Sequence, residues 1–206
     1  MNQAKANLFV VSAPSGAGKT SLLKKLISEL NGVQTSISHT TRAKRAAEVD
    51  GVDYHFVEPE AFKLLVEQEA FYEHAEVFGN HYGTSKSSIA NQREQGIDVI
   101  LEIDWQGARQ IKQQLPESLS IFILPPSKQE LESRLQGRGQ DDEAIIKGRM
   151  DAAISEMSHY NEYDYVVIND DFEQAVFEIK AIIVAERQKL AIQSKKHAQL
   201  LCNLLE

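Results

Sequence analysis

SAPSGAGKT, at residues 12–20, lies between a short apolar run and a helical pattern. The run LFVV at 8–11 is apolar and rich in β-branched side chains, as in a buried strand. Beyond the glycines, leucine and isoleucine recur at three- and four-residue spacing from Leu22 to Leu30, which predicts an amphipathic helix. Asn31-Gly32 then supplies a helix stop signal. The segment therefore predicts a strand, a glycine-rich turn and a helix, in that order.

This turn has the chemistry of a site for a nucleoside triphosphate. Glycines let backbone amides curl around phosphate oxygens, and the positive end of the following helix points at them. Lys19 is placed to reach the β- and γ-phosphates, and the Thr20 hydroxyl to bind Mg²⁺. Ala13 stands where the usual motif begins with glycine, and the other motif residues are intact. The predicted triphosphate-binding residues are Ala13, Pro14, Ser15, Gly16, Ala17, Gly18, Lys19 and Thr20.

Short apolar segments recur between helical stretches along the rest of the chain. We expect strands at 98–104, 119–124 and 165–168, and helices at 128–135 and from Phe172 to about Leu205. This alternation predicts an α/β fold with a mostly parallel sheet that is covered on both faces. The stripe expected to pack the last helix is Phe172, Val176, Ile179 and Ile183.

Two polar regions fit that alternation poorly. Residues 37–86 are rich in Tyr, Thr, Gly and His, with a hairpin-like turn at 49–51 and a helical pattern near 60–69. Residues 128–158 are charged, with two glycines in their middle. We interpret both regions as insertions that cap the open edge of the sheet.

The composition narrows the class of protein. A chain of 206 residues can bury a sufficient core without disulfides or a metal. The single cysteine, Cys202, cannot form an intrachain bridge, which is typical of a reducing compartment. The net charge of −8 argues against wrapping nucleic acid, which depends on neutralising many phosphates. No run of 18 apolar residues is present and the first residues do not resemble a signal peptide, so we expect a cytoplasmic protein.

Several further motifs closely resemble those of the guanylate kinase family. They follow the family's order from about Leu8 to about Ala185, and no N-K-x-D element of guanine-binding GTPases is present. The motifs are ISHTTRAKR at 37–45, EVDGVDYHF at 48–56, Glu73, GNHYGT at 79–84 and LEIDWQG at 101–107.

The resemblance implies a three-layer P-loop NTPase core with a parallel sheet, an inserted GMP-binding region and a helical lid. Residues 1–36, 87–127 and 159–206 would form the ATP-binding core, 37–86 the GMP-binding region and 128–158 the lid. The implied reaction transfers the γ-phosphate of ATP to GMP, giving ADP and GDP, with Mg²⁺ as the cofactor. ATP and GMP are then the expected partners, without nucleic acid or membrane, and the oligomeric state stays open.

The resemblance also assigns the GMP-binding residues. An ionised carboxylate can accept hydrogen bonds from both N1–H and the 2-amino group of guanine, whereas adenine presents a lone pair at N1. Glu73 and Thr84 are the implied guanine readers. Two arginines can form forked, charge-assisted bonds to a phosphate. The residues implied at the GMP phosphate are Ser38, Arg42, Arg45, Tyr54 and Tyr82, and Asp104 with Glu102 is implied on the side of the base and of magnesium-bound water.

On the ATP side, the resemblance implies Lys19, Arg138 and Arg149 as catalytic residues. Arg134 and Asn169 are implied in ATP binding, the latter at the adenine. The metal ligand would be Thr20, with Asp104 acting through water. Lys44 stands where the family commonly has proline, and Thr84 where serine is common.

Other interpretations remain open at this point. A non-catalytic guanylate-kinase-like module that binds peptides would share the fold, although such modules tend to lose the phosphate loop. A kinase for another nucleoside monophosphate would share the mechanism. The six histidines also suggest a zinc protein as a further alternative, although they lack the spacing of zinc ligands. Taken alone, the basic turn at 42–45 and the acid Glu73 are each typical of solvated surface.

Overall fold

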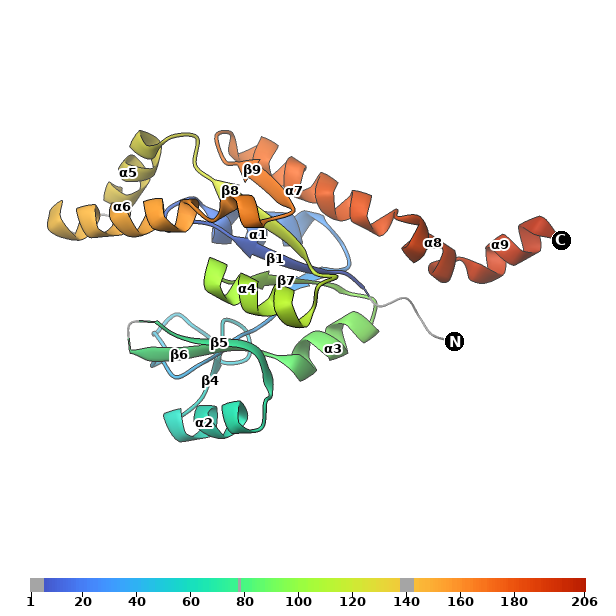
Figure 1. The fold of residues 1–206 in the computed structure, drawn as a ribbon, viewed down its shortest axis with the longest axis horizontal. Coiled ribbons are helices and arrows are strands. Elements are labelled where there is room, and N and C mark those ends of the chain that lie inside the picture. Colours follow the sequence, from blue (N-terminus) through green and yellow to red (C-terminus); the bar gives the residue numbers. More distant parts are fainter. Residues whose placement is uncertain (1–5, 78, 138–142) are drawn as a thin grey trace.

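The computed structural model describes residues 6–77, 79–137 and 143–206, which form a layered α/β molecule (Figure 1). Its central sheet has five strands in the order β2-β7-β1-β8-β9, and all of its pairings are parallel. The expected α/β class and parallel sheet are therefore confirmed. The strands are β1 (Leu8–Ser12), β2 (Val33–Thr35), β7 (Asp98–Glu102), β8 (Leu119–Leu124) and β9 (Tyr165–Ile168).

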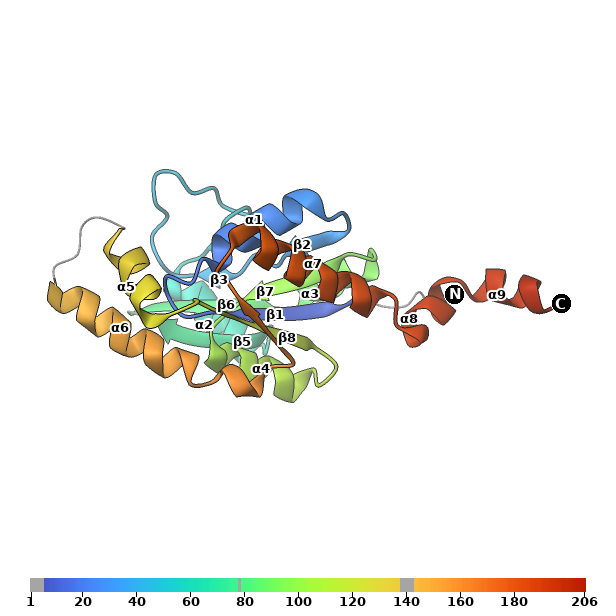
Figure 2. The same ribbon diagram turned by 90° about the horizontal axis from the view of Figure 1, so that it is seen from above.

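Helices cover both faces of this sheet (Figure 2). Alternate side chains of β1 serve the two faces, because successive residues of a strand point to opposite sides. Phe9 and Val11 join the core cluster under α1 (Lys19–Glu29) and α7 (Phe172–Arg187). Leu8 and Val10 join the cluster under α3 (Lys86–Glu94) and α4 (Trp105–Gln114). Three layers result, with the apolar strands in the middle.

A second sheet, of four strands in the order β4-β3-β6-β5, is built entirely within residues 39–85. The sequence did not predict it, because two of its strands have only two residues and its polar, aromatic composition hides the alternation. It lies below the core in Figure 1, and its helix α2 lies on its outer side. The elements are β3 (His39–Thr40), β4 (His55–Phe56), α2 (Pro59–Glu67), β5 (Phe71–Val77) and β6 (Asn80–Ser85).

Two helices, α5 (Lys128–Gln136) and α6 (Glu143–Met157), project from the end of the core opposite the C-terminus (Figure 1). They pack on each other through Leu131, Leu135 and Ala153. A 3₁₀ turn, η1 (Tyr160–Glu162), follows α6 and leads into β9.

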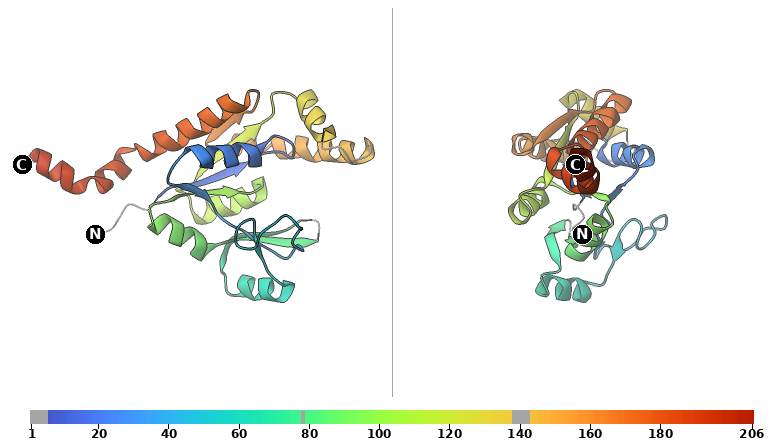
Figure 3. Two further views of the ribbon diagram at one scale, coloured as in Figure 1. Left: turned by 180° about the vertical axis from the view of Figure 1, so that it is seen from behind. Right: turned by 90° about the vertical axis from the view of Figure 1, so that its right-hand side faces the viewer.

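The single long helix expected from Phe172 to about Leu205 is wrong. The structure has α7, then α8 (Leu190–Lys196) and α9 (Ala198–Leu205), and the last two extend away from the core (Figure 3). Beyond Arg187 the helical pattern has no sheet beneath it, and the described residues of α8 and α9 include no buried side chain. Phe172 is itself 37% exposed, and Ala175 takes its expected place in the core. No helix in the described ranges is long and apolar enough to cross a membrane.

A partly buried ion pair fastens α7 to the amino-terminal edge of the central sheet. Arg187 Nε lies 2.7 Å from Asp98 Oδ2, and the backbone N–H of Asn7 donates to Asp98 Oδ1 at 2.7 Å. Arg187 also donates to the carbonyl of Gly32.

Replacing Asp98 by alanine should lower the free energy of unfolding by about 3 kcal/mol, because the change leaves a guanidinium and a backbone N–H without their shared acceptor. Urea denaturation measures this effect. The exposed pair of Lys63 and Glu67 on α2 provides the control, and Glu67→Ala should leave stability unchanged. Equal effects of the two substitutions would contradict the account.

Candidate nucleotide-binding site

The phosphate loop forms at the carboxyl end of β1, between that strand and α1. Gly16 and Gly18 have φ angles of +91° and +90°, a region that favours glycine over other residues. The N–H of Ala17 donates to the carbonyl of Pro14 at 3.1 Å and closes the turn. Gly18 is the N-cap of α1, so the amino end of that helix opens directly onto the loop. The predicted succession of strand, glycine turn and helix is confirmed.

A buried amide braces the loop from behind. Asn169 follows β9 and is 4% exposed. Its Nδ2 donates to the carbonyl of Ala17 at 2.7 Å, and its own N–H donates to the carbonyl of Leu124. A Cβ added at Gly18 would lie 2.6 Å from Asn169 Nδ2, so the loop and the brace approach as closely as glycine permits. Arg134 donates to the Asn169 carbonyl at 3.1 Å and joins α5 to this brace.

Lys19 and Thr20, the first residues of α1, face the acidic end of β7. Lys19 Nζ lies 4.0 Å from Glu102 Oε1 and 3.5 Å from the carbonyl of Ile103. The hydroxyl of Thr20 donates to the same Glu102 oxygen. Burial lowers the pKa of Lys19, and the carboxylates of Glu102 and Asp104 oppose this effect. A cation, a hydroxyl and two carboxylates therefore meet beside the loop.

A third carboxylate reaches the loop from α6. Glu156 Oε2 accepts the backbone N–H of Ser15 at 3.1 Å. Burial raises the pKa of Glu156, and the hydrogen bond from Ser15 opposes the rise. This contact fastens the helix that carries Arg149 to the phosphate loop.

The second sheet contributes a buried carboxylate near the start of α4. Glu73 on β5 is 6% exposed, and it accepts a hydrogen bond from the fully buried hydroxyl of Thr84 on β6. Burial raises the pKa of Glu73 to about 7, the Thr84 hydrogen bond opposes this, and the Asp104 carboxylate adds to it. A Cβ added at Gly107 would lie 3.3 Å from Glu73 Oε2. The absence of a side chain at Gly107 therefore lets α4 approach the carboxylate closely.

Basic and aromatic side chains gather in the same sheet, around the turn after β3. Arg42 pairs with Glu48 at 2.6 Å, and that pairing raises the pKa of Arg42. The Arg42 guanidinium lies 5.6 Å from the ring centre of Tyr54, and the rings of Tyr54 and Tyr82 are 6.0 Å apart. Glu48 also accepts the backbone N–H of Arg45 at 2.8 Å, so one carboxylate orders both ends of the basic turn.

Residues 5–186 match the family described as guanylate kinase. The guanylate kinase of Shewanella denitrificans is 58% identical over 203 residues, which cover 98% of each chain. That of Pseudoalteromonas translucida is 54% identical over the whole of both chains. The chain belongs to the guanylate kinase family. A crystal structure of the guanylate kinase from Anaplasma phagocytophilum has the same fold, with a TM-score of 0.74 and 35% identity over 92% of this chain and 90% of that chain.

Within this guanylate kinase fold, the residues predicted at the site fall into two groups. The phosphate loop, Asn169 and Arg134 form one continuous set of contacts on the core. The other group lies in the second sheet and at the start of α4. Ser38 is part of it, since its carbonyl accepts the N–H of His55 between β3 and β4. The remaining members of that group are Arg42, Arg45, Tyr54, Glu73, Tyr82, Thr84 and Asp104.

Two predicted catalytic arginines remain to be placed. Arg149 is an exposed residue of α6. Arg138 lies outside the described residues. The roles assigned to the individual side chains stay predictions.

Two carboxylates that contact the predicted site residues were not predicted from the sequence. Glu48 is the first residue of EVDGVDYHF, and its place near two arginines was a signal for an ion pair. Glu156 gave no such signal, because it lies 141 residues from its partner Ser15.

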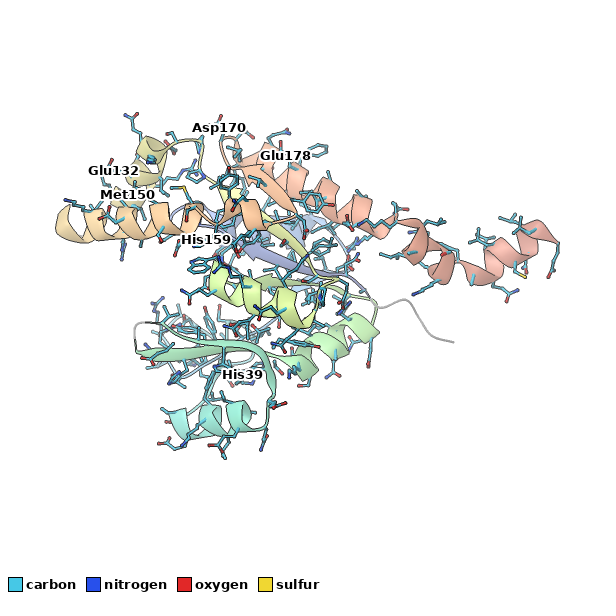
Figure 4. The ribbon with its side chains drawn as sticks, in the orientation of Figure 1. His39, Glu132, Met150, His159, Asp170 and Glu178 are labelled. Carbon is cyan, nitrogen blue, oxygen red and sulfur yellow. The ribbon has the colours of Figure 1, made fainter. Side chains whose placement is uncertain are left out.

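An aromatic junction, also not predicted from the sequence, fastens α4 to the turn η1 that follows α6. His159, labelled in Figure 4, stacks on Trp105 with ring centres 3.7 Å apart. The Arg109 guanidinium lies 4.5 Å from the Trp105 ring centre and pairs with Glu162, which lowers the pKa of Glu162 to about 2. His39, also labelled, lies far from His159 in the second sheet. In the part of the chain that the structure describes, no three metal-ligating side chains of His, Cys, Asp or Glu gather.

Gly18→Ala should abolish tight binding of a non-hydrolysable ATP analogue and lower the free energy of unfolding by about 2 kcal/mol. The reasons are the positive φ and the clash with Asn169 Nδ2. Calorimetric titration and urea denaturation measure the two effects.

Gly148 provides the control, because it is an exposed residue of α6 with open space where an added methyl group would lie. Gly148→Ala should leave stability unchanged or raise it by about 1 kcal/mol. Normal binding of the analogue by Gly148→Ala and by Gly18→Ala alike would contradict the role of the loop.

Proposed function

We propose that this chain transfers the γ-phosphate of ATP to GMP, giving ADP and GDP, through the two groups of residues described above. The observation that carries the assignment is Glu73, a buried carboxylate with a hydroxyl partner, on a strand that packs against α4 of the core that carries the phosphate loop. Membership of the guanylate kinase family supports the same reaction.

Base selection rests on Glu73 and Thr84. When ionised, Glu73 can accept hydrogen bonds from both N1–H and the 2-amino group of guanine, and the Thr84 hydroxyl supports one of its oxygens. Adenine would turn a lone pair toward this carboxylate and leave a buried charge without donors. A site built on buried polar pairing discriminates strongly for this reason.

The GMP phosphate would bind at the basic turn. Arg42 and Arg45 provide charge-assisted donors, and hydroxyls from Ser38, Tyr54 and Tyr82 complete the shell. Glu48 keeps the turn in shape by pairing with Arg42 and with the backbone of Arg45. A dianionic phosphate would then compete with Glu48 for the Arg42 guanidinium.

ATP would bind with its phosphates in the loop at 13–20 and with Arg134 and Asn169 on the core side. The oxygen donors beside the loop suit a hard cation, since Thr20 presents a hydroxyl and Glu102 and Asp104 present carboxylates. Thr20 would hold Mg²⁺, with Asp104 acting through water. When bound, the ion supplies charge neutralisation on the phosphates.

Phosphoryl transfer needs no protein nucleophile. A GMP phosphate oxygen forms the new bond to the γ-phosphorus while the bond to the β-phosphate oxygen breaks and ADP leaves. Lys19, the loop amides, Arg138 and Arg149 would stabilise the charge of the transition state. Closure of the regions 37–86 and 128–158 over the core would exclude water, so hydrolysis of ATP without GMP should be slow.

A coupled assay of ADP release tests the proposal, with ATP, Mg²⁺ and GMP, dGMP, AMP, CMP or UMP offered separately. Turnover is expected with GMP, with or without dGMP, and not with AMP or the pyrimidine nucleotides. If ATP binds and no monophosphate is phosphorylated, the kinase assignment falls and a binding module of this fold replaces it.

The same assay on Glu73→Gln should give a kcat/KM for GMP lower by about 10- to 100-fold, because one guanine donor loses its acceptor. The matched control is Glu76→Gln, an exposed acid on the same strand, which should behave as the wild type. Equal losses in both variants would remove Glu73 from base recognition.

A further inference from the structure

Helix α4 lies between the central sheet and the second sheet, along the outer edge of β5 (Figure 1). Three residues of α4 face this strand, Gly107, Gln110 and Gln114. Their spacing of three and then four residues places them on one side of the helix. Gly107 approaches the Glu73 carboxylate, and the two glutamines contact the backbone of the strand.

The glutamine contacts fall on the two residues that flank Glu73. The N–H of His74 donates to Gln110 Oε1 at 3.4 Å, and Gln110 Nε2 donates to the carbonyl of His74 at 3.5 Å. Gln114 Nε2 donates to the carbonyl of Tyr72. These carboxamides therefore pair with β5 as a neighbouring strand would, on the edge that β6 does not occupy.

The contacts from α4 support β5 next to Glu73, where its pairing with β6 is irregular. On its other edge, the pairing of β5 with β6 shifts register between Phe71 and Glu73. A shift of this kind interrupts the ladder and changes the direction in which nearby side chains point. The backbone on both sides of Glu73 is then fixed by α4 as well as by β6.

Helix α4 is also fixed in position by the core. It begins at its N-cap Asp104, directly after β7, and Asp104 Oδ1 accepts the N–H of Gly107 at 2.8 Å. The strand β7 pairs with β1, which leads into the phosphate loop. A rigid path therefore runs from the loop through β7 and α4 to the strand that bears Glu73.

We infer that Gln110 and Gln114 are positioning residues for guanine selection. They hold Glu73 at a set place relative to the phosphate loop, so that GMP meets a preorganised acceptor. The inference rests on the proposed function, since it concerns how well Glu73 reads the base. If β5 were loosened, GMP binding would also have to order the strand, and the affinity for GMP would fall.

The test compares steady-state kinetics of the wild type with those of the double variant Gln110→Ala/Gln114→Ala. We expect KM for GMP to rise about 10-fold and the preference for GMP over AMP to fall by a similar factor. KM for ATP should stay within about 2-fold of the wild type, since the phosphate loop keeps its contacts. Gln110→Glu keeps the acceptor for the His74 N–H and loses the donor, so it should show a smaller rise, about 3-fold.

Gln113 supplies the matched control on the same helix. It lines a cavity of about 270 Å³ with Lys112 and Ser118, on the side of α4 away from β5. Gln113→Ala should keep the wild-type KM for GMP and the wild-type selectivity.

Two outcomes would overturn the inference. A lower melting temperature with unchanged KM for GMP and unchanged selectivity would make the glutamines structural only. Equal changes in Gln113→Ala would show that the position on the helix, not the contact with β5, matters. If the double variant does not fold, the same comparison is made with Gln110→Glu alone. A wild-type chain that fails to phosphorylate GMP would instead overturn the proposed function, and it is recognised before any variant is made.

Discussion

Parallel pairing of β1 with both β7 and β8 is the constraint on which the site depends. In a parallel sheet all carboxyl ends meet at one edge, and ligands of open α/β sheets gather there. The phosphate loop follows β1, Glu102 ends β7, Asp104 lies two residues further on, and Asn169 follows β9. The backbone thus already places Lys19 and Thr20 close to their acidic partners, and the side chains contact them directly. A change in strand order would separate these groups, and the loop would lose the amide that braces it.

The second sheet buries a carboxyl group, Glu73, whose ionised form is energetically unfavourable there. Glu73 is buried, and because burial favours its neutral form, its pKa is raised to about 7. The Thr84 hydroxyl donates to one of its oxygens, and the absence of a side chain at Gly107 leaves room beside the other. A buried acceptor of this kind is poorly satisfied until a ligand brings two donors. In the function proposed above, the same feature that disfavours the ionised ligand-free state would favour guanine over adenine.

The core could be predicted from the sequence because its signals are local. LFVV followed by glycines, Lys19 and Thr20 specifies a strand, a turn and a helix without distant contacts. The strands at 119–124 and 165–168 were likewise predicted with their observed bounds, since both are short apolar runs bounded by turns. The second sheet was not predicted, because β3 is held by pairing with β6 across some 40 residues, and β4 in turn is held by pairing with β3.

Long-range contacts also account for what was missed at the site. The bracing of Ala17 by Asn169 spans 152 residues, and the contact of Glu156 with Ser15 spans 141. The extent of α7 was misjudged because the apolar pattern of α9 continues the helical period although no core lies beneath it. The sequence periodicity predicts which side of a helix is apolar. Whether another part of the protein covers that side depends on the fold.

The proton balance of GMP binding tests the central claim most directly, namely that a buried Glu73 carboxylate reads guanine in its ionised form. With a raised pKa, ligand-free Glu73 is partly protonated at pH 7, and two guanine donors stabilise the charged form and lower that pKa. GMP should therefore bind with release of protons, and its affinity should rise with pH through about 7. Calorimetric titration at pH 7 in two buffers of different ionisation enthalpy counts these protons. The account predicts about half a proton more released by the wild type than by Glu73→Gln, in which only the GMP phosphate titrates. Equal release by the two proteins, or net uptake by the wild type relative to the variant, would contradict it.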